Sequence, residues 1–243
     1  MLDNSWFVPI KTHPSNALRI FCFHYAGGSM SVYRTWSEHL KNADLVTIQL
    51  PGRENRFTEA LITEMDLIID NLYENFSDFD NKPYVFFGHS LGALIAFEFA
   101  KKLQKQGHLG LKNLIVSGSR APHLPIRRRL IYNLHDQELF SEIQKYNGIP
   151  ENLLAEKDLL MNIMLPIIRA DFTISDIYIS ALLKQNLKFL LQFLVEEMMI
   201  HFLLKICSSG NYTLILLTTK ALPEITSLSN HHFLKLLIVS ILS

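Results

Sequence analysis

The segment Gly88-His89-Ser90-Leu91-Gly92 has the residues of a serine nucleophile in the pattern G-x-S-x-G. An apolar run (84–87) precedes it and a helical pattern (about 91–106) follows it, which predicts a sharp turn between strand and helix. The two glycines suit this turn, because a Cβ at either position would crowd it. We predict that Ser90 is the catalytic nucleophile and that the positive end of the helix lies beside it. The alternative is a chance glycine-rich turn, which the flanking strand and helix disfavour.

A second loop, Phe23-His24-Tyr25-Ala26-Gly27-Gly28-Ser29, follows the apolar run 18–23. In proteins with this serine turn, such a loop donates a backbone N–H to the oxyanion of the reaction intermediate. The residue after the serine donates the other N–H. We therefore predict an oxyanion hole formed by the backbone amides of Ala26 and Leu91. His24 is a potential base, although a histidine that merely fills a loop is the commoner case.

These two loops require a sheet that holds them together, and short apolar runs alternate with helical patterns along the chain. The runs are too continuously apolar for a half-exposed sheet, so a parallel sheet covered on both faces is predicted. With the serine turn, this gives an α/β class and the α/β-hydrolase fold, with a mostly parallel central sheet and helices on both faces. The predicted strands are 18–23, 45–50, 84–87 and 113–117, and the predicted helices are 31–42, 64–78 and 91–106, the last ending at Gly107.

Two later segments differ in character from this alternating part. Residues 125–171 consist of polar, amphipathic helical patterns without a strand, which predicts a helical lid insertion over the active edge of the sheet. Residues 181–243 are rich in leucine and lack a clean periodicity, so the last strands of the sheet cannot be placed there. The length of 243 residues suits one α/β-hydrolase domain, 1–243.

Composition excludes several other classes of protein. The 23 basic and 23 acidic side chains balance, which gives no electrostatic reason to expect nucleic acid or an anionic membrane as a partner. Cys22 and Cys207 are too few for a disulfide framework or a cysteine zinc site. Segment 187–206 is apolar but is interrupted by charged residues, so it is not expected to span a membrane. The N-terminus lacks the pattern of a signal peptide, and we expect a cytoplasmic protein.

Four segments make a family resemblance plain: FHYAGGSMSVYRTW, QLPGRENRF, FFGHSLGALIAFEFA and LPIIRADF. In order and spacing, over about residues 15–180, they resemble the type II (external, editing) thioesterases of nonribosomal peptide and polyketide synthesis. The resemblance implies an enzyme that hydrolyses unwanted acyl groups from the phosphopantetheine arm of carrier proteins. It also implies that 125–171 covers the acyl channel, and that the protein is a monomer without metal or cofactor.

The segment Leu50-Pro51-Gly52-Arg53-Glu54-Asn55-Arg56 belongs to this resemblance and follows a predicted strand, at the edge where ligands usually bind. Its two arginines leave two interpretations open. Arg53 and Arg56 could meet the pantetheine phosphate or an acidic face of a carrier protein. A structural ion pair is at least as good an explanation.

The resemblance becomes incomplete where the base and the acid of a triad are expected, in the chain order Ser, Asp/Glu, His. Ser229-Asn230-His231-His232-Phe233-Leu234 is similar to the family's histidine segment, which makes His231 the candidate base, with an incidental surface histidine as the alternative. The family's acidic loop has no counterpart. Between Ile177 and Pro223 the only acidic residues are Glu196 and Glu197, so these are weak candidates and the acidic member is unknown.

The neighbouring reading frame suggests why residues 181–228 are aberrant. Methionine has the single codon ATG and isoleucine codons begin with AT, so Met198-Met199-Ile200 encodes Asp-Asp when read two bases along. Asp-Asp is what the family's missing loop contains. We hypothesise a frameshift near residue 181 and a compensating one before about Ser229. Sequencing the gene tests this, and an unbroken frame shared with functional relatives would exclude it.

Two other functions are compatible with the sequence. A general carboxylesterase or acyltransferase of the same fold would differ in its relative rates on esters and thioesters. A catalytically impaired remnant that only binds carrier proteins is favoured by the aberrant tail. Labelling of Ser90 by a fluorophosphonate would separate that remnant from an enzyme.

Overall fold

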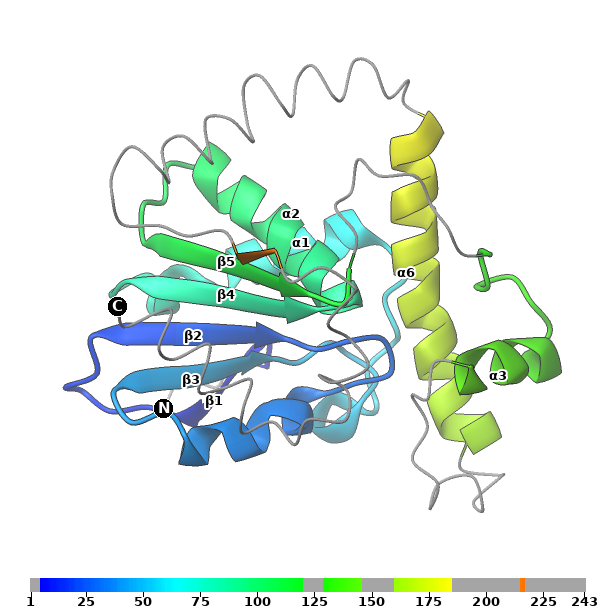
Figure 1. The fold of residues 1–243 in the computed structure, drawn as a ribbon, viewed down its shortest axis with the longest axis horizontal. Helices are drawn as coiled ribbons and strands as arrows, with labels where there is room; N and C mark the ends of the chain where they lie inside the picture. Colours follow the sequence, from blue (N-terminus) through cyan, green and yellow to red (C-terminus); the bar gives the residue numbers. More distant parts are fainter. Residues whose placement is uncertain (1–4, 120–128, 146–159, 185–214, 217–243) are drawn as a thin grey trace.

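A six-stranded sheet forms the centre of the computed structural model, which describes residues 5–119, 129–145, 160–184 and 215–216 (Figure 1). The strand order is β1-β3-β2-β4-β5-β6, and every neighbouring pair is parallel except β1 with β3. The fold is therefore the predicted mostly parallel α/β sheet. The strands are β1 (Phe7–Lys11), β2 (Leu18–Phe23), β3 (Ala43–Ile48), β4 (Tyr84–His89), β5 (Leu111–Ser117) and β6 (Ile215–Leu216).

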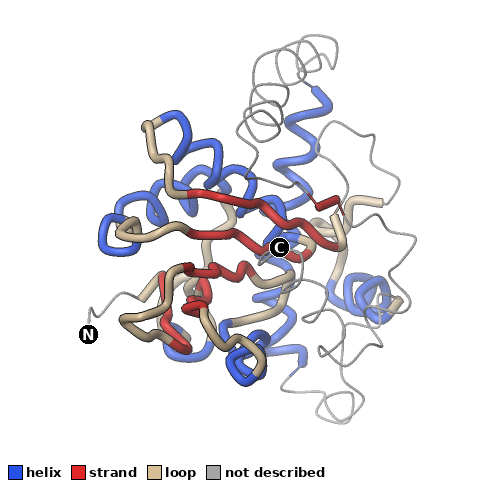
Figure 2. Tube along the Cα trace, turned by 60° about the vertical axis from the view of Figure 1, so that its left-hand side comes forward, coloured by secondary structure: helices blue, strands red, loops and turns tan. Residues whose placement is uncertain are grey.

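Helices cover the sheet on both of its faces (Figure 2). The α-helices are α1 (Met65–Glu74), α2 (Leu91–Lys105), α3 (Asp136–Gln144) and α6 (Leu165–Lys184). Shorter helical segments are η1 (Met30–Glu38), η2 (Glu54–Arg56), η3 (Ser77–Phe79) and η4 (Leu160–Met164). Helices α1 and α2 pack on one face of the sheet, and η1 packs on the other.

Alternation of side chains along the strands explains this two-sided packing. In β2, Phe21 and Phe23 join the core cluster under α1 and α2, whereas Ile20 and Cys22 join the cluster under η1. Successive side chains of a strand point to opposite faces, so a continuously apolar strand must be covered twice. The same alternation holds in β4, with the aromatic ring of Phe86 on the first face and that of Phe87 on the second.

The predicted strands are confirmed, with shifts at their ends: β3 starts and ends two residues earlier than predicted, and β4 and β5 are longer. The edge strand β1 was not predicted. It contains Pro9, which cannot donate a ladder hydrogen bond and is tolerated at an edge. Helix α2 was predicted almost to the residue, and Gly107 adopts the left-handed φ of +82° that ends it.

The predicted helix 31–42 is wrong in type and length, because the chain forms the 3₁₀-helix η1 over Met30–Glu38. Its buried side chains are Tyr33 and Trp36, three residues apart. A helix with three residues per turn places these two rings on one side, so the tighter winding suits this packing. The predicted helix 64–78 is shorter in the structure, where α1 ends at Glu74.

Helix α6 lies across the carboxyl ends of β2 and β4 (Figure 1, yellow). The predicted lid, 125–171, ends within this helix, which continues without a break through Asp171. Part of that segment is described: α3 packs against α6 through an apolar cluster that includes Leu139 and Ile168.

Most of the predicted aberrant segment 181–228 lies outside the described residues, as does the apolar segment 187–206. Strand β6 is described, and Ile215 pairs with Ile115 in parallel register. Within the described ranges, no helix has both the length and the apolar character needed to cross a bilayer.

Candidate active site

Ser90 sits at a strained turn between β4 and α2. Its backbone has φ of 54° and ψ of −115°, a conformation that residues with a side chain rarely adopt. The Ser90 amide donates to the carbonyl of Ser117 at the end of β5 (2.8 Å), which holds the turn against the sheet. Although Ser90 is the residue that precedes α2, its side chain makes no capping hydrogen bond. This is the geometry that the G-x-S-x-G pattern predicts.

The two glycines of the turn lie where no side chain fits. A Cβ on Gly88 would be 2.3 Å from the carbonyl oxygen of Gly92, and a Cβ on Gly92 would be 2.1 Å from that of Phe23. The first residues of α2 therefore pack directly on the backbone at the end of β2. This contact brings the start of α2, including Leu91, next to the loop that follows β2.

That loop is a tight turn from Tyr25 to Gly28, closed by a hydrogen bond from the Gly28 amide to the Tyr25 carbonyl (2.9 Å). Gly27 has φ of +77°, as the third position of a type II turn requires. The Gly27 amide donates to Oδ2 of Asp171 on α6 (2.7 Å). The Ala26 amide has no acceptor within the described part of the chain, and its role as an oxyanion donor stays a prediction.

Arg53 forms a buried ion pair with Asp171. Its Nη1 and Nη2 donate to the two carboxylate oxygens, each at 2.8 Å, and the side chains are 5% and 0% exposed. Arg56 is also held by the protein itself, through Glu59 (2.6 Å) and the Gln49 carbonyl (2.8 Å). Of the two interpretations of these arginines, the contacts favour the structural one. Neither guanidinium is free for a phosphate.

His24 fills the loop, which is the commoner of the two roles considered for it. Its ring is 2% exposed, and Nδ1 lies 2.9 Å from the Tyr25 carbonyl, so we assign the proton to this nitrogen. Nε2 has no hydrogen-bond partner within the described ranges. Burial, together with the nearby positive charge of Arg53, lowers the pKa of His24 to about 4.

This lowered pKa predicts a loss of stability in acid. Below pH 6.5 the unfolded chain protonates His24, whereas the folded chain keeps it neutral until about pH 4. The contribution of neutral His24 to the free energy of unfolding is therefore fully present above pH 6.5. It is lost as the pH drops, by about 1.4 kcal/mol per pH unit and about 3 kcal/mol in total. Urea unfolding between pH 7 and 4 measures this slope. The His24→Asn variant is expected to have a correspondingly shallower slope, and parallel curves for the two proteins would contradict the assignment.

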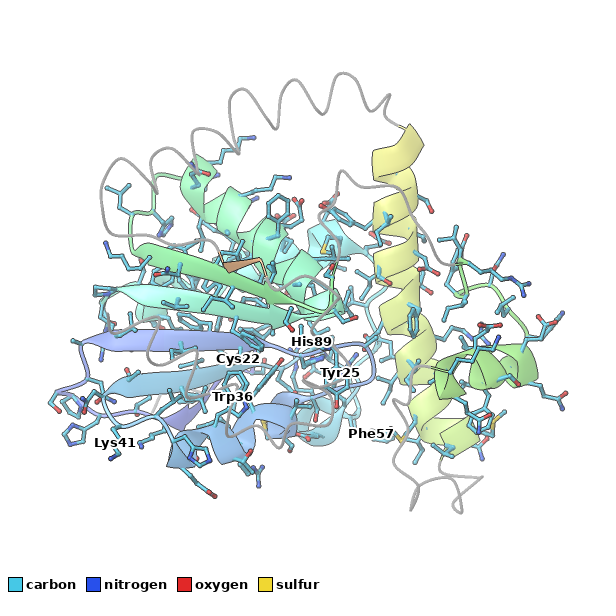
Figure 3. The ribbon with its side chains drawn as sticks, in the orientation of Figure 1. Cys22, Tyr25, Trp36, Lys41, Phe57 and His89 are labelled. Atoms are coloured by element: carbon cyan, nitrogen blue, oxygen red, sulfur yellow. The ribbon has the colours of Figure 1, made fainter. Side chains whose placement is uncertain are left out.

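His89 and Tyr25 lie beside each other at the carboxyl edge of the sheet (Figure 3). Their rings meet edge to face, with centroids 5.9 Å apart. Nδ1 of His89 is 3.1 Å from Oγ of Ser117, and burial lowers the pKa of the ring. Gly118 packs closely against the same ring, since a Cβ there would lie 2.4 Å from Cε1. His89 is therefore fixed in place next to Ser90.

The remaining predicted residues, His231, Glu196 and Glu197, lie outside the described residues, so the base and the acid stay predictions. The structure adds Asp171, which was not singled out from the sequence. The charged residues within the otherwise apolar segment LPIIRADFTISDIY were the available signal, because a buried charge must have a partner.

A strained serine between strand and helix, at the carboxyl edge of a mostly parallel sheet, defines an α/β-hydrolase. The family model described as "Thioesterase domain" matches residues 18–202. The chain belongs to the thioesterase family and is a thioester hydrolase. The match ends before the predicted base at residue 231, inside the segment that departs from the family pattern.

Named relatives and solved structures agree with this family. The gramicidin S biosynthesis protein GrsT of Aneurinibacillus migulanus is 38% identical over 176 residues, which cover 72% of this chain and 68% of GrsT. The type II thioesterase BorB from the borrelidin biosynthetic cluster has a TM-score of 0.63 and 29% identity, with 72% of this chain and 71% of BorB covered. RedJ, a thioesterase of prodiginine biosynthesis in Streptomyces coelicolor, has a TM-score of 0.62 and 33% identity, with 69% of this chain and 64% of RedJ covered.

Proposed function

We propose that this enzyme is a type II thioesterase that removes misprimed or stalled acyl groups from the phosphopantetheine arm of carrier proteins. The strained turn that presents Ser90 is the observation that carries the chemistry. The relatives named for gramicidin S, borrelidin and prodiginine biosynthesis support nonribosomal peptide and polyketide synthesis as the setting. A carrier protein is then the partner, and monomeric state and cytoplasmic location stay predictions.

In the proposed mechanism, Oγ of Ser90 attacks the thioester carbonyl and gives a tetrahedral intermediate. The amides of Ala26 and Leu91 stabilise its oxyanion, and Leu91 also brings the positive end of α2 to the site. His231 takes the serine proton and passes it to the departing pantetheine thiolate. A water molecule, deprotonated by the same base, then attacks the acyl carbonyl; the bond to Oγ of Ser90 breaks, His231 returns the proton to Oγ, and the acyl group leaves as a carboxylic acid. The carboxylate that orients His231 is unassigned, with Glu196 and Glu197 as weak candidates.

The proposed active site is bounded by the elements around the Ser90 turn. We assign residues 125–171 to a helical lid over the acyl channel, within a single domain. The described part of this segment supports the assignment, because α3 and residues 131–134 pack on α6, which lies across the carboxyl edge of the sheet.

The test is the rate of hydrolysis of three substrates by the complete chain: an acetyl-phosphopantetheinyl carrier protein, acetyl coenzyme A and p-nitrophenyl acetate. The proposal expects the highest kcat/KM for the carrier-bound thioester, because the carrier protein contributes binding. A higher kcat/KM for the ester than for both thioesters would instead support the carboxylesterase alternative.

Because residues 181–228 depart from the family pattern, a catalytically impaired protein that only binds carrier proteins is a second candidate function. Carrier binding without turnover, and without fluorophosphonate labelling of Ser90, would support it over the enzyme. Labelling that is lost in Ser90→Ala would support a functional nucleophile even if turnover is slow.

A further inference from the structure

We propose that Asp171 is a positioning residue that holds the oxyanion loop in the geometry required for catalysis. This inference rests on the proposed function, because it concerns the loop that carries the Ala26 amide. The described contacts of Asp171 are with Gly27 and Arg53, and none of them is with Ser90. Asp171 acts through the Gly27 amide, which it accepts at 2.7 Å.

The loop is held at two successive residues by one ion pair. The Gly27 amide donates to Asp171, and the Gly28 carbonyl accepts from Nη1 of Arg53 at 3.1 Å. Arg53 donates to both oxygens of Asp171, so the carboxylate and the guanidinium fix each other. The Gly27 amide belongs to the peptide group after Ala26, and the Gly28 carbonyl belongs to the peptide group before Ser29, so the ion pair fixes the peptide groups on both sides of Gly27 and Gly28. The hydrogen bond from the Gly28 amide to the Tyr25 carbonyl then fixes the peptide group that carries the Ala26 amide.

Burial makes this arrangement stiff. Asp171 is fully buried and accepts three hydrogen bonds, and Arg53 is nearly as buried. Bidentate bonds between ionised groups are stronger and more directional than neutral ones, and water does not compete for them here. A preorganised oxyanion hole needs such rigidity, because its donors must already point at the place where charge develops.

The same helix also supports the loop sterically. A Cβ on Gly27 would lie 2.7 Å from Cγ1 of Ile168, one turn before Asp171 on α6. The Gly27 amide thus donates to Asp171 on α6, and the Gly28 amide donates to the Tyr25 carbonyl within the turn. Of the three consecutive amides of Ala26, Gly27 and Gly28, that of Ala26 is the one without an acceptor in the described ranges, so it is the one left for the oxyanion.

A second buried aspartate on α6 provides a matched control. Asp176 is also fully buried and accepts backbone amides, those of Ile131 (2.8 Å) and Tyr132 (3.2 Å). Both of these described contacts lie in the segment assigned to the lid and not in the oxyanion loop. Asp171→Ala and Asp176→Ala therefore each remove one buried carboxylate from the same helix, with different loops affected.

The experiment combines steady-state kinetics with amide hydrogen exchange on both variants of the complete chain. Asp171→Ala is expected to lower kcat by about 10- to 100-fold, with KM within about threefold, because a misplaced donor weakens only the transition state. Peptides covering residues 24–29 should exchange faster, while those covering 131–132 keep their protection. Asp176→Ala should show the reverse exchange pattern, and its kinetic effect should fall mainly on KM, because its described contacts hold the segment assigned to the lid over the acyl channel.

Equal losses of kcat in the two variants, or a rise in KM alone for Asp171→Ala, would overturn the proposal. So would unchanged exchange at 24–29. If Asp171→Ala fails to fold because Arg53 loses its partner, the double variant R53M/D171L removes both charges at similar volume and should show the same kinetic and exchange pattern. Hydrogen exchange tests the role of Asp171 separately from the proposed thioesterase function. Absence of turnover by the wild-type protein would contradict the proposed function. The exchange data at residues 24–29 would still show whether Asp171 holds the loop.

Discussion

Thioester hydrolysis is expected to fall by about a million-fold in kcat when Ser90 is replaced by alanine, because no other group can form the acyl-enzyme. The oxyanion amides belong to the backbone and persist in the variant. A small residual rate above that of water should therefore remain. Measurement of kcat on an acetyl-phosphopantetheinyl carrier protein, with the fluorophosphonate reaction as a second readout, checks this prediction.

Stability serves as the control for this variant. Alanine at position 90 keeps the same strained φ of 54°, and the serine side chain makes no capping hydrogen bond that could be lost. The melting temperature of Ser90→Ala should therefore equal or slightly exceed that of the wild type. Retention of more than a hundredth of the wild-type kcat by a well-folded variant would mean that Ser90 is not the nucleophile.

Gly92→Ala is expected to lower both stability and activity strongly. Its Cβ would lie 2.1 Å from the carbonyl oxygen of Phe23, and 2.6 Å from that of His24. Both are backbone atoms at the end of a central strand, so helix α2 must shift away from β2. We expect the free energy of unfolding to fall by about 3 kcal/mol, as for severe overpacking. A shift of about 1 Å at the start of α2 should also lower kcat by about a hundredfold.

Gly107→Ala, at the other end of the same helix, is the matched control. A Cβ there meets no atom within 4 Å, and only the left-handed φ of +82° opposes the substitution. It should cost about 1 kcal/mol and leave kcat unchanged. Denaturant unfolding and kcat of both variants decide the matter. A Gly92→Ala variant as stable and as active as Gly107→Ala would show that the contact with β2 is not needed.

The parts of the fold that follow from local pattern were predictable. Strand β2 and helix α2 lie where periodicity places them, since continuous apolar runs must be buried on both faces and Gly107 ends the helix. Strand β1 was missed because its pairing with β3 is a tertiary contact and its proline argues against a strand. The winding of η1 depends on how Tyr33 and Trp36 fit beneath the sheet, which sequence periodicity does not specify.

For the site, the sequence was sufficient to predict the strained turn at Ser90 and the need for its two glycines, because the geometry of a tight turn is local. It left Arg53 between a substrate contact and an ion pair, since the partner lies 118 residues further along the chain. Asp171 was overlooked for the same reason: its neighbours in sequence do not reveal that it contacts the turn after β2. His231, Glu196 and Glu197 stay predictions.

The hydrogen bond between Gly27 and Asp171 joins residues 144 positions apart, and this separation has a consequence during synthesis of the protein. At about 5–20 residues per second, the ribosome adds Asp171 roughly 7 to 30 s after Gly27. Throughout that interval the nascent chain contains the loop but not the residue that fixes it. The oxyanion hole can therefore reach its final geometry only after most of the core has been translated, so the serine turn exists well before it can hydrolyse a thioester efficiently.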